Sequence, residues 1–159
     1  AYTTGSTPDI QEDTSKTMTD MTIKQLSIFI ENKGGTLVKV LDTLSKGGIQ
    51  IIASTVADTK DYGIYRVLCD KPTQAFIMLR EAGINVQLAD VIALSIDDIP
   101  GQAAEAVEAI SEAGVSILYM YSFLWKGKGT LVMRTDPVER AKEIITIKKL
   151  TFLTEIDFE

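Results

Sequence analysis

The feature that most constrains this chain is an internal repeat. Sliding the sequence by 66 positions places apolar residues on apolar residues and glycines on glycines over a long stretch. The matched pairs include Leu26 with Ile92, Ile28 with Leu94, Gly35 with Gly101, Leu44 with Ile110 and Gly48 with Gly114. Later parts match at a shift of 65, which places Pro72 on Pro137 and implies one residue lost in the intervening hairpin. Two copies of one small domain explain this pattern best.

Each copy has the pattern strand, helix, strand, strand, helix, strand. In the first copy, residues 24–30 alternate polar and apolar as in a half-buried strand, and a helical spacing of apolar residues follows. Runs of β-branched and aromatic residues around 58–61 indicate a hairpin, and a second helix is expected from about Pro72 to Ala82. Right-handed crossovers then predict an α+β fold of two ferredoxin-like βαββαβ repeats, each a four-stranded antiparallel sheet with two helices on one face.

The predicted boundaries leave no flexible linker between the copies. Residues 1–21 are polar, resemble neither a signal peptide nor a packed element, and are expected to be disordered or extended. Repeat 1 is expected over 22–89 and repeat 2 over 90–159. Because repeat 2 begins at once, we expect the two copies to hold a fixed relation and to form one continuous sheet.

Composition excludes several classes of function. The net charge is −6 and the 16 basic residues are scattered, which argues against a nucleic-acid surface. The longest apolar stretch, 116–125, is far short of the roughly 20 residues of a membrane helix. The lone Cys69 indicates a reducing, cytoplasmic location and a buried thiol. The absence of histidine removes common nucleophilic and zinc chemistries, so no metal, cofactor or catalytic residue is expected.

The strand-to-helix segments carry a family resemblance. The stretches ENKGGTLVKVLDTLSKGGIQI and DDIPGQAAEAVEAISEAGVSI, which begin at residues 31 and 97, resemble the N-x-P-G-x-L…G-(I/V)-N-I signature of ACT domains. The resemblance covers about 23–158 and is closest to bacterial proteins built from two ACT domains, a group that LYMYSF at 118–123 also resembles. It implies that amino acids bind where two ACT domains meet side by side, held by the first strand-to-helix loop.

Local chemistry supports a carboxylate at these loops. A helix N-terminus offers free N–H groups and a partial positive charge, and glycine lets a ligand approach the backbone. The candidates in the first copy are Asn32, Gly34, Gly35, Thr36 and Leu37; those in the second are Asp98, Pro100, Gly101 and Gln102. Asp98 replaces the family asparagine, so the second copy suits an anion less. The alternative is that both glycine segments are only turns.

Further candidates come from the expected pairing of the copies. If they pair through their second strands, the loop of the first copy would face Ser116, Tyr119, Tyr121 and Ser122. Tyrosines that alternate on a strand are also commonly packed against neighbouring elements. Met120, which points the opposite way, is expected in the core.

The sequence therefore predicts a non-enzymatic sensor of a free amino acid or similar small carboxylate, acting by population shift that a partner protein or the second subunit of a homodimer reads. The alternative is an interaction module that regulates a partner enzyme through the open sheet face and binds no metabolite.

Overall fold

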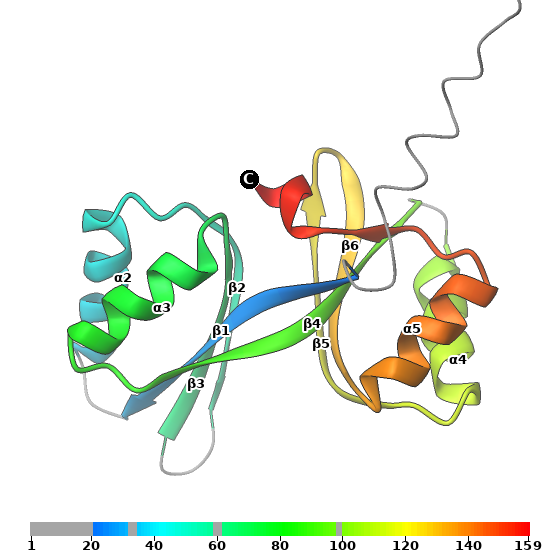
Figure 1. Ribbon diagram of the computed structural model, residues 1–159, viewed down its shortest axis with the longest axis horizontal. Coiled ribbons are helices and arrows are strands. Elements are labelled where there is room, and N and C mark those ends of the chain that lie inside the picture. The colour runs from blue at the N-terminus through cyan, green and yellow to red at the C-terminus, as the bar shows by residue number, and fades with distance from the viewer. Residues whose placement is uncertain (1–20, 32–34, 59–61, 98–99) are drawn as a thin grey trace, which may run out of the picture.

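The computed structural model describes residues 21–31, 35–58, 62–97 and 100–159. These residues form two units whose strands lie together in the middle of the molecule, with helices on the two outer sides (Figure 1). All strand pairs are antiparallel, and the strand order is β2-β3-β1-β4-β6-β5, with β7 added beside β4. The expected continuous sheet and α+β fold are confirmed.

Repeat 1 contains the first helix pair. Its elements are β1 (Thr22–Glu31), α2 (Thr36–Lys46), β2 (Ile51–Asp58), β3 (Tyr62–Cys69), α3 (Pro72–Glu81) and the first part of β4 (Val86–Ile96). Proline opens α3 because its missing N–H is not needed in a first helical turn. The helices pack on the face that carries alternate apolar residues of β1 and β3, such as Leu26, Ile28 and Val67.

Repeat 2 follows the same plan. It uses the second part of β4, then α4 (Gln102–Glu112), β5 (Ser116–Trp125), β6 (Lys128–Asp136), α5 (Val138–Ile147) and the short β7 (Phe152–Leu153). A 3₁₀ helix, η2 (Glu155–Phe158), ends the chain, and Thr154 and Asp157 form a capping box at its start. The buried core beneath α4 and α5 includes Leu94, Ile110 and Met133.

The two repeats share strand β4. The last strand of repeat 1 runs without a break into the first strand of repeat 2, so Ala89 and Asp90, the expected boundary, lie inside one strand. The Val86–Ile92 part of β4 pairs with β1, and the Ile92–Ile96 part pairs with β6. A continuous hydrogen-bonded strand resists bending at a single point, and this fixes the direction of one repeat relative to the other.

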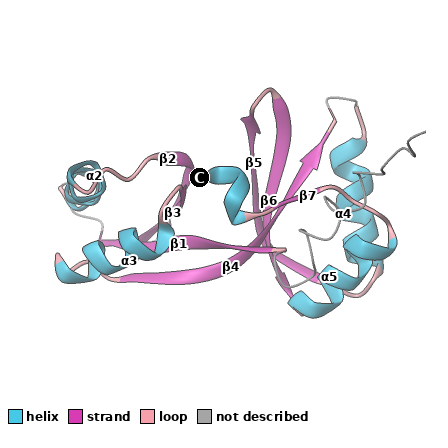
Figure 2. Cartoon of the chain, turned by 45° about the horizontal axis from the view of Figure 1, so that its top comes forward, coloured by secondary structure: helices cyan, strands magenta, loops and turns pink. Residues whose placement is uncertain are grey.

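A third core lies between the helix-free faces. Its buried members come from both repeats and from η2: Ile23, Leu68, Val91, Ala93, Val132 and Phe158. The helix pairs lie outside these faces in both views (Figures 1 and 2). The sheet face that we expected to be open to a partner protein is therefore packed against the other repeat.

The repeat register is 66 throughout, which corrects the expected loss of one residue. Phe29 N–H donates to the Asn85 carbonyl at 2.9 Å, and Ser95 N–H donates to the Thr151 carbonyl, also at 2.9 Å. Ala75 and Ala141, again 66 apart, are both fully buried. The match of Pro72 with Pro137 suggested a lost residue because the two prolines occupy different helix positions. Pro72 is the first residue of α3, whereas Pro137 lies one residue before the first residue of α5.

The expected pairing of the second strands is wrong. Strands β2 and β5 lie at opposite ends of the strand order, β2 beside β3 and β5 beside β6. Met120 on β5 is also not a core residue, since 45% of it is exposed. Because β5 is an edge strand, α4 and α5 do not cover the face of β5 that carries Leu118, Met120 and Leu124, which we call its outer face. Alternation correctly predicted that Met120 faces away from its tyrosine neighbours but could not show which face is buried.

Candidate functional site

The turn of repeat 1 begins helix α2 with a glycine. Gly35 is the N-cap of α2, with φ 109° in the left-handed region, and no side chain among the described residues caps the helix. Its carbonyl accepts the first intrahelical bond, from the Lys39 N–H at 2.9 Å, so the N–H groups of Thr36 and Leu37 have no intrahelical partner. A side chain added at Gly35 would meet nothing within 4 Å. Glycine is therefore required by the backbone conformation, and the space in front of the turn is open.

A hollow of about 160 Å³ adjoins this turn. It is lined by Ile30, Glu31, Leu37, Val56, Asp58, Tyr62 and Gly63, from the ends of β1, β2 and β3 and the start of α2. Leu37, Val56 and Tyr62 are apolar or aromatic and more than a third exposed. The hollow therefore combines apolar walls, carboxylates and a helix N-terminus that favours negative charge.

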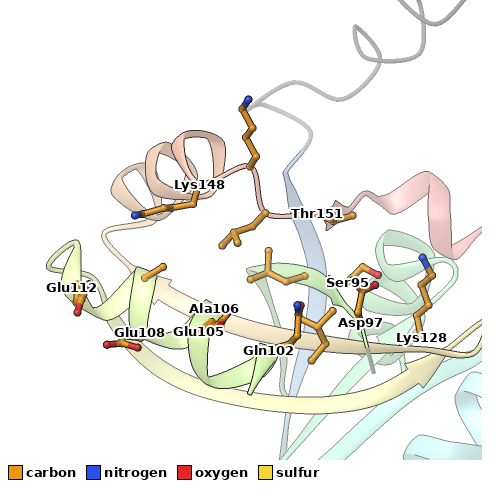
Figure 3. A pocket seen from close by; sticks show the side chains of 15 residues that line it. Ser95, Asp97, Gln102, Glu105, Ala106, Glu108, Glu112, Lys128, Lys148 and Thr151 are labelled. Atoms are coloured by element: carbon orange, nitrogen blue, oxygen red, sulfur yellow. The ribbon is translucent and has the colours of Figure 1, made fainter. Parts of the chain in front are cut away.

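Repeat 2 has the same turn. Gly101 is the N-cap of α4, with φ 94°, and it too lacks a side-chain cap. The next residue, Gln102, lines a larger hollow of about 450 Å³ between α4, the end of β4 and the segment 148–151. Figure 3 shows Glu105, Glu108 and Glu112 along α4 on one side of it and Lys148 on the other. The first turn of α4 contains Glu105, whereas the first turn of α2 contains no acid.

Small side chains line part of this hollow. Ala106 and Ala109 of α4 line it, and the corresponding residues of α2 are Val40 and Thr43. Val40 and Ala106 are both buried at the same place in their repeats, so the smaller residue leaves space that its counterpart fills. These alanines can be read from the sequence. The sequence does not show that a hollow remains between them and the segment 148–151.

The tyrosines of β5 lie at the contact between the repeats. The Tyr121 hydroxyl donates to Oε1 of Gln25 at 2.8 Å, and Nε2 of Gln25 donates to the Tyr119 hydroxyl oxygen at 2.8 Å. Gln25 lies on β1 and is completely buried. The guanidinium carbon of Arg66 on β3 lies 3.8 Å from the centre of the Tyr119 ring. The two tyrosines thus join repeat 2 to repeat 1.

The predicted residues are not all brought together. Gly35, Thr36 and Leu37 follow the end of β1, whereas Tyr119 and Tyr121 contact Gln25 near its beginning, about 20 Å away along the strand. The second-copy residues Pro100, Gly101 and Gln102 lie at the start of α4. Ser116 opens β5, and Ser122 faces away from its neighbour Tyr121. Asn32, Gly34 and Asp98 lie outside the described residues.

Sequence reasoning missed Gln25. A single glutamine in an alternating strand is usually a surface residue, and the only signal for its burial is the pair of tyrosines 94 and 96 residues further along.

Within the described ranges, no group of three or more acidic or cysteine side chains could hold a metal ion. No helix in the same ranges is long and apolar enough to cross a membrane.

These features define a class of protein: a pair of ferredoxin-like repeats with glycine turns at equivalent helix starts. The family model described as an ACT domain pair matches residues 21–159, and the chain belongs to this family. No curated protein gives a significant match.

Solved structures agree with this assignment. A protein from Bacteroides thetaiotaomicron is 35% identical, with a TM-score of 0.82 over 87% of this chain and 96% of that one. The ligand-free regulatory subunit of aspartate kinase from Thermus thermophilus shares the fold at 15% identity, with a TM-score of 0.57 over 80% of this chain and 93% of that one. The corresponding subunit from Thermus flavus gives 16% identity and a TM-score of 0.53 over 80% and 93% of the two chains.

Proposed function

We propose that this chain is a non-catalytic, cytoplasmic regulatory protein that binds a free amino acid at a strand-to-helix glycine turn. The observation that carries the proposal is the equivalence of Gly35 and Gly101. Both are left-handed N-caps without a capping side chain, and each adjoins a hollow. Uncapped N–H groups at a helix start need acceptors, and a ligand carboxylate supplies them.

The turn of repeat 1 suits an α-amino acid better. Its carboxylate would accept hydrogen bonds from the N–H groups at the start of α2, where the first turn holds no competing acid. Asp58 lines the same hollow and would attract the ammonium group, while Leu37 and Val56 offer apolar surface to a side chain. In repeat 2, Glu105 in the first turn opposes a carboxylate.

A second copy of the chain would complete the site. Two apolar side chains that line the hollow are exposed, Leu37 at 36% and Val56 at 54%, and so are two more on α2, Val38 at 60% and Leu41 at 38%. They lie on α2 and on the edge strand β2, whose outer backbone has no strand partner in the part of the chain that the structure describes. The corresponding residues of α4 are Ala103, Ala104 and Val107, which offer less apolar surface. We therefore assign the subunit contact to the β2 edge.

Regulation would follow from differential binding. An amino acid held between two chains favours the arrangement that closes the hollow, and a partner protein that reads this arrangement senses the ligand. The fold shared with a regulatory subunit of aspartate kinase supports this role.

A thermal-shift screen of the free amino acids on the full chain tests the proposal. At 100 times its dissociation constant a ligand adds about 2.7 kcal/mol of stability. For a chain of 159 residues this raises the unfolding midpoint by roughly 5–10 °C. If no amino acid at millimolar concentration moves the midpoint, the proposal fails.

The alternative is an interaction module without a metabolite. The observation that favours it is the outer face of β5, where Leu118 is 54%, Met120 45% and Leu124 76% exposed. These residues lie on an edge strand without a single charged residue, a combination typical of a surface that another protein covers. The amino-acid screen separates the two functions, because only the sensor changes its midpoint.

A further inference from the structure

Arg66 lies at the junction between the repeats. Its strand neighbours Tyr65 and Val67 belong to the core beneath α2 and α3, so Arg66 projects from the helix-free face of β3. Its guanidinium carbon is 3.8 Å from the centre of the Tyr119 ring. Its Nε is buried and has no hydrogen-bond acceptor among the residues that the structure describes. Over the described ranges, Arg66 forms no ion pair with a carboxylate.

Tyr119 offers a second donor beside this guanidinium. Its hydroxyl oxygen already accepts a hydrogen bond from Nε2 of Gln25 at 2.8 Å. The Oε1 atom of Gln25 accepts a hydrogen bond from the hydroxyl of Tyr121, also on β5. Among the residues with described positions, no acceptor takes the Tyr119 hydroxyl proton. Gln25 therefore holds the Tyr119 oxygen in place, and no other described residue takes up its proton.

Arg134 adds a second positive charge from repeat 2. It is the cross-strand partner of Tyr119 on β6, so the two side chains leave the same face of the sheet, with Cβ atoms about 5 Å apart. Arg134 is exposed, and it too forms no ion pair in the described part of the chain. The Tyr119 ring thus has one arginine stacked on its face and another beside it on the next strand.

We propose that Arg66, Tyr119 and Arg134 form a binding site for a small oxyanion, carboxylate or phosphate, at the junction of the two repeats. A buried N–H without an acceptor is costly, and an anion oxygen would satisfy it. Stacking on Tyr119 occupies one face of the guanidinium and leaves its edge available for in-plane hydrogen bonds to an oxyanion. Solvent reaches part of both arginine side chains, since Arg66 is half-buried and Arg134 is exposed.

This site is separate from the glycine turns. The Gln25 end of β1 is about 20 Å from the Glu31 end, which leads to Gly35. An anion here would join repeat 1, through Arg66, to repeat 2, through Tyr119 and Arg134. Its binding would therefore stabilise the junction and raise the unfolding temperature, with the added stability growing as the logarithm of the anion concentration above the dissociation constant.

The test uses the full chain, inorganic phosphate and malonate as probes, and sodium chloride at matched ionic strength as the reference. Calorimetry should show saturable binding of at least one probe and a raised unfolding midpoint that sodium chloride does not reproduce. Binding of phosphate alone identifies a phosphate site, and binding of malonate alone identifies a carboxylate site. The absence of saturable binding by both probes overturns the proposal.

Three variants locate the binding. Arg66→Gln and Arg134→Gln should each weaken the bound probe by at least about tenfold, because each removes a charge-assisted contact. Arg80→Gln is the matched control, since Arg80 also lies over an aromatic ring, 5.5 Å from the Phe76 centre, but on α3 away from the junction. Equal weakening by Arg80→Gln overturns the proposal.

Two further variants keep the test clear. If Arg66→Gln does not fold, as judged by circular dichroism, the exposed Arg134→Gln carries the test. Gly48→Val, at a glycine of positive φ that belongs to neither proposed site, should leave phosphate and malonate binding unchanged. If Gly35→Val abolishes that binding and Arg66→Gln does not, the anion sits at the glycine turn and the junction site is wrong.

Discussion

The Tyr121 hydroxyl donates a 2.8 Å hydrogen bond to Oε1 of Gln25, across 96 residues of sequence and between the two repeats. Gln25 is completely buried, and its amide also donates to Tyr119 and Ser27. Burial raises the pKa of Tyr121 above its ordinary value because the phenolate would lose hydration, and the neighbouring Tyr119 adds to this rise. The junction between the repeats is therefore a packed contact in which both the oxygen and the nitrogen of the Gln25 amide are hydrogen-bonded.

Replacing Tyr121 by phenylalanine should destabilise the whole chain. The change removes a buried donor and leaves Oε1 of Gln25 without a partner, which costs about 1–3 kcal/mol. Tyr65→Phe is the control, since Tyr65 donates to the exposed Ser54 within repeat 1 at 3.0 Å and should cost less. Urea unfolding of both variants measures the difference. A smaller loss for Tyr121→Phe than for Tyr65→Phe would show that the junction contributes little.

The thiol of Cys69 should be inert in the folded protein. Burial raises its pKa from 9.0 to about 11, and the nearby Asp70 charge adds a smaller rise that a hydrogen bond from the Lys71 backbone opposes. A thiol reagent at pH 8 should therefore label the native chain slowly and the urea-unfolded chain fast. Rapid stoichiometric labelling of the native chain would contradict the burial.

The same shift predicts a pH dependence of stability. The pKa is higher in the folded state, so the contribution is complete below pH 9.0 and is lost as pH rises from 9.0 towards about 11. The free energy of unfolding of the native chain should fall more steeply over this range than that of Cys69→Ala. Parallel curves from urea titrations would show that Cys69 does not carry the effect.

Association of two chains should depend on the β2 edge. Val56 is 54% exposed on β2, and lysine there would place a charge in the proposed subunit contact. Val56→Lys should shift the sedimentation profile towards monomer. Leu124→Lys, an equally drastic change on the exposed edge strand β5, should leave it unchanged. If Leu124→Lys dissociates the chains and Val56→Lys does not, the contact lies on the other edge.

Much of the fold could be predicted because it depends on local patterns. Alternating residues of β1, helical spacing in α2 and glycines at matched positions give each repeat its elements, and the repeat itself gives their arrangement. The ladder bonds of Phe29 and Ser95, 66 residues apart, show how closely the copies agree. The strand order within each repeat then follows from right-handed crossovers.

The relation between the repeats could not be predicted, because it depends on contacts remote in sequence. Sharing of β4 fixes that relation, and it places β2 and β5 at opposite edges instead of side by side. Met120 was misplaced for the same reason. The partners of Tyr119, namely Gln25 and Arg66, come from strands of the other repeat, and no local pattern pairs them.

The amino-acid site at the first glycine turn is tested most directly by comparing two glycines. Gly35 and Gly48 both have a positive φ, of 109° and 71°, and a side chain added at either would meet nothing within 4 Å. Valine at each position should therefore cost similar backbone strain. Only Gly35 lies at the helix N-terminus proposed to bind the ligand carboxylate, whereas Gly48 lies just past the C-terminal end of the same helix.

Calorimetry of both folded variants with the amino acid found in the screen gives the decision. Gly35→Val should weaken binding by at least about tenfold, the loss of one charge-assisted hydrogen bond of about 1.5–3 kcal/mol, and Gly48→Val should leave it unchanged. Gly101→Val should weaken binding less than Gly35→Val if repeat 1 holds the better site. Unaltered affinity in folded Gly35→Val would contradict the account and reduce the glycine turns to chain connections.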